Sequence, residues 1–106
     1  MIESVQKIKE ALIKACVKSR PSYFKSYLLS DKVSNDWPNN ESFYLFFKGM
    51  VYNSRKMSIG EIYLKLESKS NNINFYKFYD NYHLHPRLTL IVEERINSIH
   101  IEVLPF

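Results

Sequence analysis

Two histidines are the first residues in this chain whose type and spacing could support chemistry. His83 and His85 lie two residues apart, so on a strand they would point to the same side, as two ligands of one metal ion must. We find no Asp or Glu at a ligand spacing from the pair, and His100 belongs to another predicted strand. We therefore interpret the pair as a polar strand end before Pro86, and we expect no metal and no other cofactor.

Acid–base and nucleophilic catalysis also have little support. Glu93 and Glu102 are predicted to share the exposed face of the last hairpin with His100, and paired carboxylates can divide acid and base roles. Nothing in the sequence suggests that either carboxylate is desolvated, which such a division requires. Cys16 falls on an apolar helical stripe, where a thiol behaves as a small hydrophobe. The pattern favours a protein that is not an enzyme.

Aromatic residues and lysines alternate in two predicted strands, in YLK at residues 63–65 and in FYKFY at residues 75–79. On neighbouring strands, Tyr63, Lys65, Tyr76 and Lys77 could stack exposed bases beside a positive surface. The glycine-containing aromatic signature of RNA-recognition sheets is absent. Single-stranded nucleic-acid binding is therefore kept as an alternative.

Three helices are predicted in the first half of the chain. Apolar residues recur at helical spacing over residues 2–17, and Pro21 must end that helix and begin a short second one. Residues 30–40 are rich in turn formers and predict a loop. The third helix begins at an Asn40 N-cap, and Gly49 inside it suggests that another element packs too closely there for a side chain. Its apolar stripe consists of Phe43, Phe46, Phe47, Met50 and Val51.

Four strands are predicted in the second half, because the apolar period changes from about 3.6 residues to 2. The run 73–82 has aromatic residues on both faces and can also be read as a helix, but we predict a strand. A two-residue Asn97-Ser98 turn predicts a final hairpin in which Val92 pairs with Val103. The expected fold is α+β, with N-terminal helices packed on a curved four-stranded antiparallel meander.

Composition sets the class of protein. The 106 residues are 45% hydrophobic, which suits one domain over residues 1–106. A net charge of +4 permits an anionic partner without requiring one. A single cysteine excludes a disulfide framework and favours a reducing compartment. The N-terminus resembles neither a signal peptide nor a membrane span, so we expect a cytoplasmic protein with no membrane partner.

In its element order the chain resembles the cone-shaped nuclear-transport-factor-2-like fold. Members usually place a further strand between the second and third helices, where residues 30–40 are too polar to supply one here. The fold includes isomerases and dehydratases as well as binding modules. No functional residue carries over from this resemblance. A second hypothesis, from the enzyme or ligand-binding class, is a pocket between the third helix and a curled sheet, lined by Phe43, Phe47, Tyr63 and Tyr79. In its small size and its lack of catalytic signatures, the chain also resembles the immunity proteins that bacteria pair with toxins.

The leading hypothesis is a non-enzymatic protein-binding module, most concretely an immunity-type inhibitor that binds and neutralises a bacterial toxin domain. Surplus aromatic residues with a charged rim are typical of a protein-binding surface. A small-molecule-binding or enzymatic pocket protein and a single-stranded nucleic-acid-binding protein stay open as alternatives. The predicted partner contacts are Trp37, Tyr76, Phe78, Tyr82, Glu93, His100 and Glu102.

Overall fold

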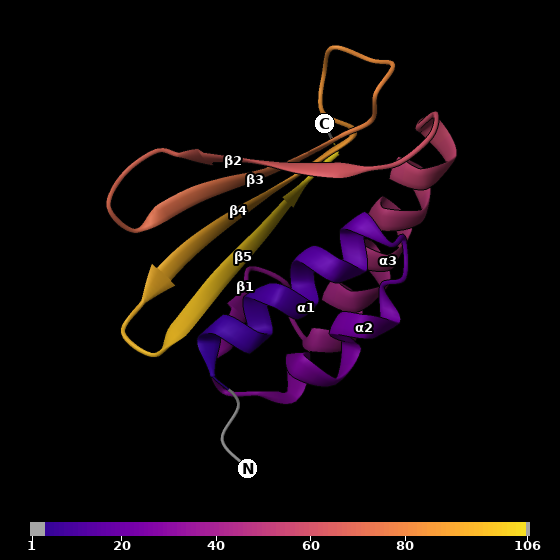
Figure 1. Ribbon diagram of the computed structural model, residues 1–106. Helices are drawn as coiled ribbons and strands as arrows, with labels where there is room; N and C mark the ends of the chain where they lie inside the picture. The colour runs from indigo at the N-terminus through magenta and orange to yellow at the C-terminus, as the bar shows by residue number, and fades with distance from the viewer. Residues whose placement is uncertain (1–3, 106) are drawn as a thin grey trace.

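The computed structural model describes residues 4–105, which form a helical layer and a sheet (Figure 1). The helical layer contains α1 (Val5–Val17), α2 (Ser22–Lys25), the 3-10 helix η1 (Ser26–Leu29) and α3 (Asn40–Met57). The sheet has the order β1-β5-β4-β3-β2. Its strands are β1 (Val33–Asn35), β2 (Tyr63–Ser68), β3 (Ile73–Tyr79), β4 (Leu88–Arg95) and β5 (Ser98–Leu104).

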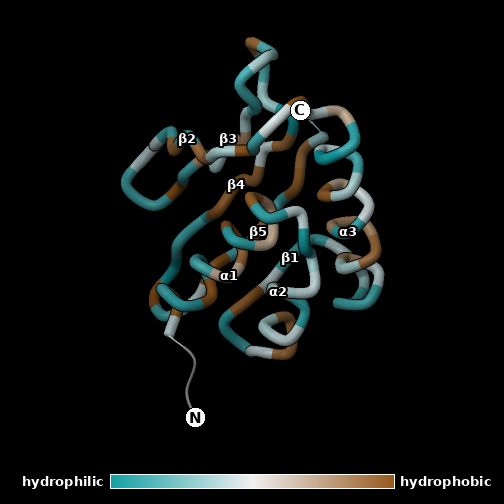
Figure 2. Tube along the Cα trace, turned by 45° about the vertical axis from the view of Figure 1, so that its right-hand side comes forward, coloured by the Kyte–Doolittle hydropathy of each residue, from teal (hydrophilic) through white to brown (hydrophobic). Residues whose placement is uncertain are grey.

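The helices cover one face of the sheet, which confirms the α+β class. Figure 1 shows α1, α2 and α3 on the same side of the strands, and within residues 4–105 no helix covers the other side. Figure 2 shows hydrophobic segments in the central strand β4 and in α1. The core between the layers includes Ile8, Leu12, Phe24, Phe43, Phe47, Phe78, Leu90, Val92, Ile99 and Ile101.

The first helix follows its sequence pattern closely. The Lys7 amide donates to the N-cap hydroxyl of Ser4 over 3.1 Å. After the C-cap the chain turns at Ser19, whose φ of 55° is left-handed, and Pro21 then begins the short helices as predicted. Residues 2 and 3 of the predicted helix lie outside the described residues.

The third helix begins one residue earlier than predicted. Its N-cap is Asn39, whose Oδ1 accepts from the Ser42 amide over 2.8 Å, while the Asn40 side chain donates to the Leu28 carbonyl. The expectation of close packing at Gly49 is wrong: the residue is exposed, and a Cβ there would meet no atom within 4 Å. Of the predicted stripe, Phe43, Phe47 and Val51 are buried, whereas Phe46 and Met50 are half-buried.

The prediction that residues 30–40 form only a loop is wrong, because β1 lies within them. Val33 pairs in parallel with Ile99 of β5, and the Ile99 amide donates to the Lys32 carbonyl over 2.8 Å. The sheet is therefore five-stranded and mixed instead of four-stranded and antiparallel. The exposed edge of β5 supplies the pairing partner, so tertiary context overrides the polar composition of the segment.

The last four strands form the predicted antiparallel meander, with a different turn in the final hairpin. The turn residues are Ile96 and Asn97, and Asn97 has a left-handed φ of 60°. Val92 consequently pairs with Ile101 instead of Val103. A shift of two residues keeps the side chains within the two strands on their predicted faces, since side chains alternate with period two. Ile96, predicted to pair with Ile99, is instead an exposed turn residue.

Candidate functional site

The face of the sheet that no described helix covers is the candidate functional site, and we call it the open face. Strand register assigns its side chains, because residues paired across neighbouring strands point to the same side. One row across the sheet consists of Glu67, Phe75, Ile91 and Glu102, and the next consists of Lys65, Lys77, Thr89 and Leu104. Outside these rows lie the Tyr63–Tyr79 pair on one side and Ile73, Glu93, His100 and Ser34 on the other.

Aromatic rings with lysines above them occupy the β2–β3 half of the open face. The rings of Tyr63 and Tyr79 stack with centroids 6.0 Å apart, and Lys65 Nζ lies 5.3 Å from the Tyr79 centroid. Lys69 Nζ and Lys77 Nζ lie 4.9 and 5.8 Å from the centroid of Phe75. This half therefore presents a ridge of amphipathic side chains with three lysines.

One glutamate partly neutralises these lysines. Glu67 accepts from Lys69 Nζ at 2.5 Å and from Lys77 Nζ at 2.6 Å. The hydrogen bond from Lys69, and after it the one from Lys77, lower the pKa of Glu67 to about 2. The same contact with Glu67 raises the pKa of Lys77. Three lysines and one carboxylate leave this half of the face positively charged.

The β4–β5–β1 half of the open face is acidic. Glu93 is paired with His100 across the strands, and its Oε1 accepts from Arg95 Nε over 2.7 Å. His100 Nε2 lies 3.0 Å from Asp36 Oδ1, and Glu102 is exposed beside it on the same strand. The open face is therefore bipolar, with a basic half over β2–β3 and an acidic half over β4–β5–β1.

The structure brings together three of the predicted contact residues, places Trp37 beside one of them, Glu102, and separates the others. Glu93, His100 and Glu102 share the open face and line a hollow of about 200 Å³ with Ile73 and Ile91. Trp37 lies at the β1 edge, 41% exposed, with its ring 4.8 Å from that of Phe46. Tyr82 is 70% exposed but belongs to the loop after β3, because that strand ends at Tyr79 instead of residue 82.

For two of the predicted contact residues the expected exposure of the side chain is wrong. Tyr76 is 5% exposed and Phe78 is fully buried, because both point into the helix-covered core. Their neighbours Phe75, Lys77 and Tyr79 have the opposite parity and occupy the open face instead. Alternation along this strand identified the two sets of side chains, but aromatic residues on both faces left no signal for which set is buried.

The predicted ligand pocket does not form from the residues expected to line it. Phe43 and Phe47 are buried in the core between the layers. Tyr63 and Tyr79 stack on the open face, on the other side of the sheet. The four side chains are therefore separated by the sheet itself.

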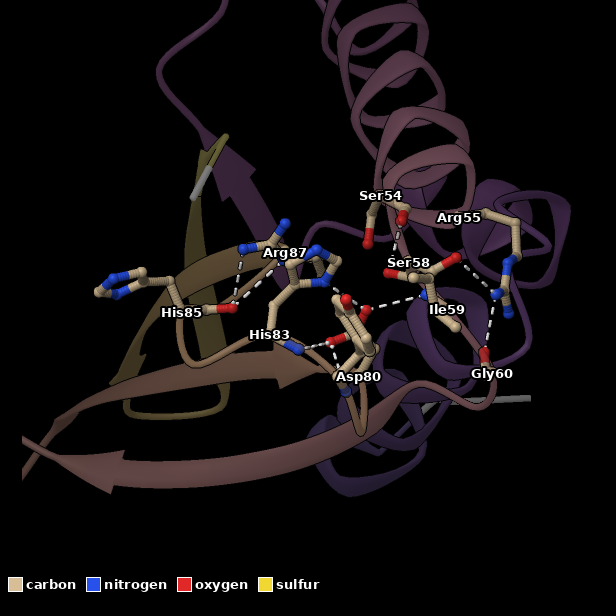
Figure 3. Close-up of polar contacts among 10 residues, drawn as sticks. Ser54, Arg55, Ser58, Ile59, Gly60, Asp80, His83, His85 and Arg87 are labelled. Carbon is tan, nitrogen blue, oxygen red and sulfur yellow. Dashed lines mark hydrogen bonds and ion pairs between the residues drawn. The ribbon is translucent and has the colours of Figure 1, made fainter.

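A buried carboxylate that the sequence argument missed lies beside the histidine pair. Asp80 accepts hydrogen bonds from the amides of Ile59, Tyr82 and His83 and from His83 Nδ1, at 2.8, 3.2, 2.8 and 2.7 Å (Figure 3). Burial by itself would raise the pKa of Asp80, but these hydrogen bonds together hold it well below its usual value. The sequence signal that could have identified this carboxylate is its position at the end of a strand, three residues before His83.

The histidines at 83 and 85 do not converge as metal ligands. They lie in the loop between β3 and β4, and Figure 3 shows His83 turned toward Asp80 while His85 points away. Two further hydrogen bonds hold the chain at the end of α3. Ser58 Oγ donates to the Ser54 carbonyl, and the Arg55 guanidinium donates to the Gly60 carbonyl. We assign Asp80 a structural role, joining the segment after α3 to the end of β3.

Cys16 is buried in the core, and burial raises the pKa of its thiol. A thiol that resists ionisation is a poor nucleophile, in keeping with its place on the apolar face of α1.

Comparison with known proteins finds no protein-family model and no curated protein that matches this chain. Within residues 4–105, none of the helices combines the length and the apolar character needed to cross a bilayer.

Proposed function

We propose that this protein is a non-enzymatic binding module whose open face docks a partner protein. The observation that carries the proposal is the bipolar charge of that face. Lys65 and Lys77 lie at one end, Glu93 and Glu102 at the other, and the partly buried Phe75 and Ile91 lie between them. An apolar centre with a charged rim is the usual anatomy of a protein interface.

The partner that fits has the opposite charge arrangement. An acidic patch would face the lysines of β2–β3, and a basic patch would face the glutamates of β4–β5. A nucleic acid fits less well, because a phosphate backbone is negative along its whole length and would meet Glu93 and Glu102 at one end. This argument ranks the protein partner above the nucleic-acid alternative.

In its most concrete form the module is an immunity-type inhibitor that neutralises a bacterial toxin domain in the cytoplasm. A protein whose cysteine is buried, and whose sheet has one face that no described helix covers, suits an inhibitor that acts by covering a surface. The strand β1 between the second and third helices also supports the resemblance to the nuclear-transport-factor-2-like fold, since members of that fold usually have a strand there.

The test is capture of a partner from native cells, combined with charge reversal. We expect the protein to capture one partner at stoichiometric yield, and Lys65→Glu or Glu93→Lys to release it. Lys48→Glu, an exposed residue of α3 on the helical side, is the matched control and should retain the partner. The captured protein should arrest growth when expressed alone and should lose that effect when this protein is co-expressed.

Four results would overturn the proposal. The first is the absence of any stoichiometric protein partner. The second is equal capture by the open-face variants and the control. The third is strong binding of a single-stranded oligonucleotide that falls steeply with salt, which would favour the nucleic-acid alternative. The fourth is self-association of the purified chain through the open face, measured by sedimentation. The partner would then be a second copy of this chain instead of a different protein.

A further inference from the structure

Three side chains with metal-binding atoms converge at the β1–β5 edge of the sheet. They are Asp36, in the segment directly after β1, and His100 and Glu102 of β5. Their ligand atoms all lie within 4.8 Å of one another, and the His100 Nε2 to Asp36 Oδ1 distance is 3.0 Å. The parallel pairing of β1 with β5 produces this cluster, because it places Ser34 beside His100 and carries the chain on to Asp36.

The imidazole of His100 is held in the orientation that a metal ligand needs. Its Nδ1 lies 2.8 Å from Ser34 Oγ, and its Nε2 faces the carboxylate of Asp36. Metal-binding histidines almost always engage their second ring nitrogen with a neighbouring polar group in this way, which fixes the tautomer and the ring direction. The His100 side chain is only 16% exposed, so the orientation is also constrained by packing.

The two carboxylates can complete a coordination sphere with small movements. Zinc binds nitrogen and oxygen ligands at about 2.0–2.2 Å, so tetrahedral ligand atoms stand about 3.5 Å apart. The 3.0 Å between His100 Nε2 and Asp36 Oδ1 is shorter than that spacing by about 0.5 Å, so these two atoms must separate slightly to hold an ion. Asp36 and Glu102 are both exposed, so rotation of their side chains can bring the remaining atom closer. Two hollows border Glu102, of about 260 and 200 Å³, and they leave room for a water ligand.

We propose that Asp36, His100 and Glu102 form a divalent metal site that binds Zn²⁺ through one imidazole nitrogen and two carboxylates. One imidazole with two carboxylates suits zinc better than magnesium or calcium, which prefer oxygen ligands alone. Glu93 lies across the strand pair from His100, but Arg95 engages its carboxylate, so it is not assigned as a ligand. Ser34 is a positioning residue that acts through His100.

The test uses the untagged, metal-free full chain titrated with ZnCl₂ by calorimetry. We expect one zinc ion per chain, and we expect His100→Gln, Asp36→Asn and Glu102→Gln each to weaken binding by more than about 10-fold. His85→Gln removes an exposed histidine of the β3–β4 loop and is the matched control, with unchanged affinity. Thermal melts of the metal-free variants establish that each one is folded.

Nitrogen-15 spectra of the histidine rings give a second readout, because a loss of stability would not shift the ring signal of one histidine selectively. Zinc should shift the Nε2 signal of His100 and leave those of His83 and His85 in place. Ser34→Ala should weaken zinc binding by about 10-fold while His100 stays the ligand. Undiminished affinity in His100→Gln would overturn the proposal, as would zinc-induced shifts confined to His83 or His85. Equal affinity for Mg²⁺ and Zn²⁺ would also contradict it.

Discussion

The main-chain amide of Ile59 donates a hydrogen bond to Asp80 Oδ2 over 2.8 Å, although 21 positions separate the two residues. Ile59 lies between α3 and β2, and Asp80 directly follows β3. The same carboxylate also accepts from two amides and one ring nitrogen in the loop before β4. One buried side chain therefore joins the segment between α3 and β2 to the end of β3 and to the loop before β4.

Replacement of Asp80 by Asn should destabilise the protein and change its pH dependence. The amide presents only one oxygen to four donors, so buried donors are left unsatisfied. Folding lowers the pKa of Asp80, so the charged carboxylate stabilises the folded state above its ordinary pKa of 3.8. That stability is lost as the pH falls below this value. Thermal melts at several pH values between about 2 and 7 measure both effects.

The control for Asp80→Asn is Asp31→Asn, which removes an exposed carboxylate from the turn before β1. We expect a lower Tm at neutral pH for Asp80→Asn alone, and a smaller fall in Tm between neutral and acid pH than in the unmodified protein. Equal Tm values for the two variants would show that the Asp80 hydrogen bonds do not stabilise the fold.

Two aromatic residues three positions apart on β3 test which side of the sheet is buried. Phe78→Ala should cost about 3–5 kcal/mol, because Phe78 is fully buried beneath the helices. Phe75→Ala, on the open face, should cost less than about 2 kcal/mol. Chemical denaturation measures both, and Phe78→Leu is the substitute if the alanine variant does not fold. A larger cost for Phe75→Ala would reverse the assignment of the faces.

The same strand shows how far the sequence determines the fold. Period and turn residues predicted the helices and the antiparallel meander, since these follow from local spacing. The identity of the buried face of β3 depends on where the helices lie, and β1 depends on an unpaired edge 66 residues away at His100. Neither is a local property. The sharing of one face by Glu93, His100 and Glu102 was predicted because side chains of one parity on a hairpin lie on the same face.

Gly49 should be replaceable by Ala with a gain in stability. The residue lies inside α3, and a Cβ built there meets no atom within 4 Å. Alanine loses less conformational entropy on folding, so we expect a gain of about 0.5–1 kcal/mol. Gly60→Ala is the contrasting variant, because Gly60 has a φ of 77°. A left-handed alanine costs about 1–2 kcal/mol.

Chemical denaturation of the two glycine variants gives opposite signs under this interpretation. A loss of stability in Gly49→Ala would mean that another element approaches α3 at this position in solution. A neutral result in Gly60→Ala would mean that residue 60, in the loop before β2, does not hold the left-handed φ of 77° in solution.

The low pKa of Glu67 should depend on both of its lysine partners. Nuclear magnetic resonance titration should give a pKa of about 2 for Glu67, and Lys69→Met and Lys77→Met should each raise it toward the ordinary 4.5. Lys65→Met is the matched control, because Lys65 lies over the ring of Tyr79 instead of contacting Glu67. Added salt should raise the pKa as well, since exposed ion pairs are screened. A pKa that stays near 4.5 in the unmodified protein would show that Lys69 and Lys77 do not hold Glu67 in solution, and that no contact with Glu67 neutralises these two lysines of the basic half.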